Sequence, residues 1–268
     1  MNHALRTLWL IAAVLLNGCT ATAQQRPESA SARLATAEAM FTERCKKAGV
    51  FIHRTAENVE GIFLLKVRPE NEDPDFNDQF RLNDPYGKDL NAKGYIMTFV
   101  RGSYQAQTKG TPAPGSPPRL GYRYVDALDP KDGKRYRYTG SVREVEVTAP
   151  LSGITVKRTK FVLDQIPAPD PASRYGVTYD DISTPEEREY WIAGSSLKVI
   201  DLQTNEVMAE RIGYMMDRGQ GNDSGGRSPW LFAADNACPE FAPRNGSRAQ
   251  PYQSLDFTES VLKPKREN

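Results

Sequence analysis

Hydrophobic positions in residues 31–47 recur every three to four residues, which is the spacing of one face of an α-helix. Ala37, Phe41 and Cys45 lie on this face, and most of the charged residues between them fall off it. Gly49 follows as a stop signal. The pattern therefore predicts a helix over 31–47 whose apolar face, including Cys45, contacts a core.

After residue 49 the pattern changes to short runs rich in β-branched and aromatic residues, which is typical of strands. These runs cover 50–55, 61–68, 95–100, 121–127, 135–139, 143–147 and 154–165. The clearest hairpin joins 197–202 to 207–214 through the polar turn 203–206. We expect a mainly β protein (a β-rich α+β fold): an antiparallel twisted sheet or sandwich with a leading N-terminal helix.

Breaks between the runs outline one globular region over 33–268. A polar stretch at 69–93 is rich in Asp, with Pro74 and Pro85 within it, and reads as one long loop. Residues 109–119 are rich in Pro and Gly and form a second predicted loop. Three prolines after residue 165 leave open a division into two sub-lobes near 165–185. Residues 230–238 are expected to be a short helical or irregular segment.

The first 18 residues follow a different pattern. Arg6 precedes an apolar run at 8–16 that is too short to cross a bilayer, so the segment reads as a targeting signal. Its end, Leu16-Asn17-Gly18-Cys19, resembles the bacterial lipobox. The resemblance implies a signal peptide over 1–18, acylation of the Cys19 thiol and a flexible tether over 19–32. An ordinary secretory signal cut near 21–23 is the alternative.

The lipobox resemblance also gives an expected location. Thr20 follows the cysteine, and no Asp stands there to signal retention at the inner membrane. We therefore expect an outer-membrane lipoprotein that faces the periplasm and contacts the membrane through its acyl chains, since each buried methylene contributes about 0.8 kcal/mol.

Charge and cysteine content refine this picture. The 268 residues hold 35 basic and 34 acidic side chains, and removal of 1–18 takes away only Arg6, so the mature charge is balanced. This balance gives no indication of a nucleic-acid partner. After acylation of Cys19, Cys45 and Cys238 remain, and in an oxidising periplasm one disulfide is the simplest outcome. Two buried free thiols are the alternative.

Catalytic chemistry finds little support in the sequence. His53 is the one histidine left after signal removal, so a multi-histidine zinc site is excluded. Residues 221–226 miss the G-x-S-x-G spacing of a hydrolase nucleophile. The adjacent carboxylates at 180–181 and 186–187 lie near a predicted turn, as surface acids commonly do. We predict no catalytic residue, no metal and no cofactor, and an enzyme with an unrecognised site remains an alternative.

The acidic loop at 71–78 could bind a protein or a cation, or could simply be solvated. Counted from Asp73, the sixth position of an EF-hand pattern is Asp78 where Gly is needed, and the twelfth is Asp84 where Glu is needed. The EF-hand pattern therefore fails, and the three interpretations, a solvated loop, a protein-binding loop and a metal site, all stay open.

Several segments together resemble a known family, the periplasmic immunity lipoproteins that accompany type VI secretion lipase effectors. They are the lipobox, Cys45 at the end of the first helix, the strand at 59–64, the hairpin at 201–210, Ala237-Cys238-Pro239 and the tail at 261–264. The resemblance implies that the protein binds and inhibits a cognate secreted lipase. A structural lipoprotein that scaffolds the envelope or the secretion machinery is the alternative.

An inhibitor of this kind needs a contact surface with aromatic or Arg anchors. Two loops are the candidates, the acidic loop and the Gly-rich loop that follows residue 218. Their candidate partner-binding residues are Asp73, Asp75, Phe76, Asp78, Phe80, Tyr86, Arg227 and Trp230. The aromatic residues among them are equally expected as core residues.

Overall fold

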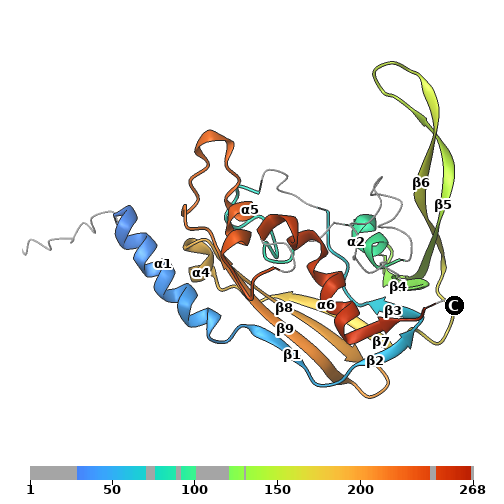
Figure 1. Cartoon of the computed structure of the whole chain (residues 1–268), viewed down its shortest axis with the longest axis horizontal. Helices are drawn as coiled ribbons and strands as arrows, with labels where there is room; N and C mark the ends of the chain where they lie inside the picture. Colours follow the sequence, from blue (N-terminus) through green and yellow to red (C-terminus); the bar gives the residue numbers. More distant parts are fainter. Residues whose placement is uncertain are drawn as a thin grey trace, which may run out of the picture.

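The structure, a computed structural model, describes residues 29–70, 76–88, 92–100, 121–129, 131–241 and 246–266. It is mainly β with a leading helix, as predicted. Helix α1 (Ala30–Cys45) starts after Ser29, whose hydroxyl accepts the Ala32 N–H as an N-cap. Helix α1 lies at one end of the long axis of the molecule, and the β5–β6 hairpin projects at the other end (Figure 1).

A nine-stranded sheet forms the body, in the order β1-β9-β8-β7-β3-β4-β5-β6, with β10 paired to β9. Its strands are β1 (Gly49–Ile52), β3 (Gly61–Leu64), β4 (Tyr124–Leu128), β5 (Arg135–Thr148), β6 (Thr155–Pro167), β7 (Tyr175–Asp181), β8 (Ile192–Asp201), β9 (Glu206–Met216) and β10 (Ala237–Cys238). A second, two-stranded sheet joins β2 (Ala56–Val59) to β11 (Leu262–Pro264).

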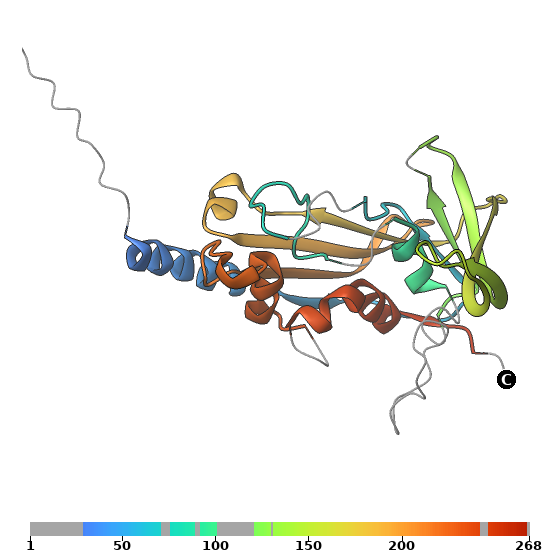
Figure 2. The ribbon, with the colours of Figure 1, turned by 90° about the horizontal axis from the view of Figure 1, so that it is seen from above.

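The helices that follow α1 are short. They are α2 (Ala92–Phe99), α4 (Pro185–Glu189), α5 (Pro229–Ala233) and α6 (Gln253–Val261). Single 3₁₀ turns η1 to η4 cover Ser224–Gly226, Ala234–Asn236, Gly246–Arg248 and Gln250–Tyr252. Seen from above, α5 and α6 lie on the same side of the main sheet (Figure 2).

The sheet is mixed, which corrects the prediction of an antiparallel sheet. Strand β3 runs parallel to both of its neighbours, β4 and β7, and β11 runs parallel to β2. Parallel neighbours require a long crossover, and the long segment between β3 and β4 supplies one. Hydrophobic alternation carries no information about strand direction, so the sequence pattern could not distinguish the two arrangements.

The strand predicted at 95–100 is also wrong, because helix α2 ends there. Tyr95, Ile96 and Phe99 are its buried residues, and the rings of Tyr95 and Phe99 pack edge to face with centroids 5.2 Å apart. Their spacing fits one side of a helix. A six-residue apolar run is too short for periodicity to separate helix from strand.

The predicted hairpin at 197–214 and the predicted helical or irregular segment at 230–238 are confirmed. The β8–β9 hairpin forms with Asp201 opposite Glu206 at its turn. Residues 230–238 form most of α5, then η2 and β10. The two strands predicted within 135–147 are a single strand, β5. Within 165–185 lies β7, which pairs with β3 and β8, so the main sheet continues through that segment.

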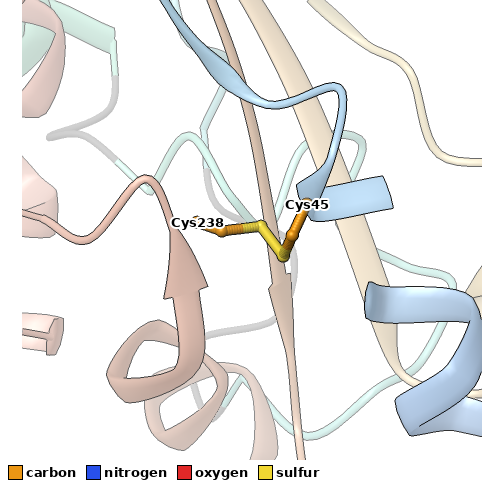
Figure 3. The surroundings of a disulfide bond; sticks show 2 residues. All are labelled: Cys45 and Cys238. Atoms are coloured by element: carbon orange, nitrogen blue, oxygen red, sulfur yellow. A yellow bond between two sulfur atoms is a disulfide. The ribbon is translucent and has the colours of Figure 1, made fainter. Parts of the chain in front are cut away.

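One disulfide joins the end of α1 to β10 (Figure 3). Cys45 and Cys238 have Cα atoms 5.6 Å apart, and they are the pair that the cysteine count predicts. Strand β1 pairs with β9 up to Ile212, and β10 continues along the same edge from Tyr214. The bond therefore links the segment that leads into β1 with β10. These segments are far apart in sequence, but both strands pair with β9 along the same edge.

Candidate interaction surfaces

The structure brings together the two loops that the sequence names as separate candidates. The Trp230 backbone N–H donates to the Phe76 carbonyl oxygen over 3.2 Å, and the Trp230 indole N–H donates to the Asp78 carbonyl oxygen over 2.8 Å. Residues 76–88, which belong to the long polar stretch that contains the acidic loop, therefore contact the start of α5. Asp73 and Asp75, like Cys19 and the predicted loop 109–119, lie outside the described residues.

Two of the predicted anchors belong to the core. Tyr86 and Trp230 are each only 1% exposed, so neither can present its ring to a partner. Trp230 packs against Trp191 with ring centroids 4.9 Å apart. The Tyr86 hydroxyl lies so close to Gly213 that a Cβ there would be 2.1 Å from its oxygen. Burial of large rings stabilises the loop, which corrects their assignment as contact residues.

The polar residues of these loops mainly hold the loops in shape. The Asp78 carboxylate accepts the N–H groups of Phe80 and Arg81, over 2.9 and 2.8 Å, and these hydrogen bonds hold the pKa of Asp78 below its usual range. The Arg227 guanidinium pairs with the Asp217 carboxylate, which raises the pKa of Arg227. Both charged groups are thus engaged by neighbouring groups of the protein, although Asp78 is exposed.

One predicted contact residue and one neighbouring aromatic residue are exposed at the surface of these loops. Phe80 is 53% exposed, and Phe232, which the sequence set did not include, is 49% exposed. The Arg227 guanidinium lies 4.5 Å from the centre of the Phe232 ring. Phe80 and Phe232 are therefore the exposed apolar side chains through which these two loops could contact a partner.

The most prominent surface feature was not predicted. Residues 143–160, from β5 through the turn into β6, project from the body as a two-stranded ribbon, here called the arm (Figure 1). Its turn presents apolar side chains to solvent: Leu151 is fully exposed and Ile154 is more than half exposed. Val142, on β5 at the base of the arm, is also about half exposed. The alternating charges of these strands suggest half-buried elements of a sheet, and only the chain path shows that neither strand continues against the body.

The arm ends in an ordered turn. The Ala149 N–H donates to the Ile154 carbonyl over 2.9 Å, and the Gly153 N–H donates to the Ala149 carbonyl over 2.9 Å. Gly153 has a φ of 64°, a left-handed conformation that glycine adopts without strain. This geometry keeps Leu151 at the tip in a defined position.

The base of the arm is fixed to the body by a buried carboxylate. The Arg137 guanidinium donates to both oxygens of Asp126 over 2.7 and 2.9 Å, and the Ser173 hydroxyl donates to Asp126 over 2.8 Å. The hydrogen bonds that Arg137 donates to Asp126 raise the pKa of Arg137. Tyr138, next to Arg137 on β5, and Phe161, farther along on β6, are buried in the main core. The arm is thus a rooted projection of the sheet.

The residues considered for catalysis have structural surroundings. His53 is exposed at the end of β1. The Glu187 carboxylate is buried, caps α4 by accepting the Thr184 N–H over 2.7 Å, and pairs with Arg44. Across the described ranges, no cluster of three or more His, Cys, Asp or Glu residues could hold a metal ion.

Comparison with protein family models, with curated proteins and with solved structures finds no match to this chain. In the part of the chain that the structure describes, no helix combines the length and the apolar character that a membrane crossing requires. The arm and the exposed remainder of the two loops are therefore described from their own geometry.

Proposed function

We propose that this chain is an immunity lipoprotein: anchored in the outer membrane by acyl chains on Cys19, it binds a cognate secreted lipase in the periplasm and blocks it. The observation that supports a binding role best is the arm, whose tip exposes Leu151 completely. Exposed apolar groups on a projecting, rooted element are typical of an interaction site.

The placement of the arm suits a tethered binder. The proposed tether over 19–32 leads into α1, and the arm lies at the opposite end of the long axis (Figures 1 and 2). A protein anchored through its N-terminus would thus hold the arm away from the anchor point. Tethering also raises the local concentration of an inhibitor at the membrane that a lipase attacks.

The chemistry of the tip suits the proposed target. A lipase binds acyl chains, so the entrance to its active site must be apolar. Leu151 and Ile154 are aliphatic and together with the turn form a narrow tip that could enter such an opening. A stable complex buries about 800 Å² on each partner, so the arm would supply the anchor and the neighbouring surface the remainder.

Co-expression tests this proposal. A phospholipase identified at a neighbouring gene would be directed to the periplasm with the lipoprotein or with an empty vector as control. We expect the lipoprotein to prevent lysis and to co-purify with the phospholipase. Lysis with both proteins present at full level would overturn the proposal, and an assembly operon at the locus would then favour the scaffold alternative.

A further inference from the structure

The strand register sorts the charges of the arm onto two opposite faces. Arg143 lies opposite Lys160 and Val145 opposite Arg158, and side chains on alternate positions share a face, so Arg143, Arg158 and Lys160 project to one side. We call this side the basic face. Glu146, opposite Lys157, projects to the other side together with Glu144.

The basic face is available to a partner. Arg158 and Lys160 are exposed, and no ion pair occupies either one in the described ranges of the chain. Arg143 shares its guanidinium with Asp164 over 2.7 Å, and both of these side chains are about half exposed. An exposed ion pair of this kind is weak because water screens it, so Arg143 could exchange Asp164 for a partner carboxylate.

Apolar side chains continue the basic face toward the tip. Val147 lies opposite Val156 on the same face, and the turn beyond them carries Leu151 and Ile154. From the tip toward the body, the arm thus presents first an apolar end and then the basic face, which runs along one side.

We propose that the arm inserts its tip into an apolar cleft of a protein whose rim carries carboxylates on the side that meets Arg143, Arg158 and Lys160. This inference rests on the proposed function and assigns the cleft to the lipase. The narrow ribbon fits a recess better than a flat surface, and opposite charges at a rim set orientation and association rate. An anionic membrane surface fits less well, because Glu144 and Glu146 lie level with the basic residues and would be repelled.

Matched charge reversals test the assignment by titration calorimetry against the purified phospholipase of the co-expression test. R158E/K160E reverses the basic face, and E144K/E146K reverses the opposite face by the same amount. We expect R158E/K160E to weaken binding by about 30-fold or more, and E144K/E146K to change it less than about threefold. All four positions are exposed, so thermal unfolding should stay near that of the unchanged domain.

The tip is tested in the same assay with L151D, and V50D on β1, at the opposite edge of the main sheet, is its control. L151D should weaken binding at least about 30-fold, since it places a charge in the apolar cleft, and V50D, at a half-exposed apolar residue, should leave binding unchanged. Unchanged affinity for both R158E/K160E and L151D would overturn the arm assignment while leaving the proposed function standing. A failure of the unchanged domain to bind the phospholipase would instead overturn the proposed function.

Sedimentation with vesicles of phosphatidylglycerol and phosphatidylethanolamine separates the membrane alternative. The unacylated mature domain should stay in the supernatant. Binding to these vesicles that is lost in R158E/K160E and in L151D would identify the arm as a membrane contact and would overturn the protein-cleft assignment.

Discussion

Removal of the disulfide gives the most quantitative test of this structure. Replacement of Cys45 and Cys238 by Ser in the mature domain opens a loop closed across a separation of 193 residues. The chain-entropy model assigns about 5 kcal/mol to a loop of that length, as an upper figure. Since whole domains are stable by about 5–15 kcal/mol, the bond would carry a large share of the total.

The structure indicates where this loss arises. Strands β1 and β10 remain hydrogen-bonded along the same edge of β9 without the bond, and Ala37 of α1 stays buried against Ile192 and Met216. The native contacts thus survive, and the change acts mainly by expanding the unfolded chain. We therefore expect a native-like far-UV spectrum together with a much lower free energy of unfolding.

Equilibrium unfolding in urea, followed by Trp fluorescence, measures the effect. The free energy of unfolding of the double Ser variant should be lower by about 3–5 kcal/mol. Its urea midpoint should fall accordingly, with a steeper slope because its unfolded state exposes more surface. The parent domain treated with dithiothreitol should match the variant. A difference below about 1 kcal/mol, or free thiols on both cysteines in the untreated domain by mass spectrometry, would refute the reasoning.

Three further predictions concern a buried carboxylate, a buried ring and the anchor. Asp201→Asn should cost about 2 kcal/mol at pH 7, since Arg174 and then Arg54 donate to this carboxylate and hold its pKa well below the usual range. That contribution is present above about pH 4 and is lost as the pH falls toward the native pKa, so urea midpoints of parent and variant should converge in acid. Trp230→Ala should cost about 4 kcal/mol and lower Tm by about 10 °C in calorimetry, because the ring is buried. Cys19→Ala should abolish metabolic labelling with a palmitate analogue and release the protein into the soluble periplasm.

Each of these predictions has a control or a contradicting result. A constant gap between parent and Asp201→Asn from pH 7 to pH 2 would show that the charge of this carboxylate does not stabilise the fold. Phe232→Ala is the exposed match for Trp230→Ala and should cost under 1 kcal/mol, so equal losses would contradict the burial argument. Unlabelled parent protein that is free in the periplasm would remove the anchor from the proposed function.

The partner-binding candidates show how far composition can locate a surface. Aromatic residues in polar loops are candidates both for interfaces and for cores, because the same apolar area drives both. The chain path buried Tyr86 against Gly213 and Trp230 against Trp191, while Phe80 stayed exposed. No local feature of the sequence distinguishes these positions.

The sequence alone determined the leading helix, the β8–β9 hairpin and the mainly β class, because each depends on periodicity or turn chemistry within a few residues. The cysteine count likewise named the pair that the structure joins. Only the tertiary structure decided that β3 runs parallel to its neighbours, that α2 is a helix, and that residues 143–160 stand away from the body. These features depend on contacts between segments that are distant in sequence. The hydrophobic pattern indicates which residues must be buried, but it does not indicate which other segment will cover them.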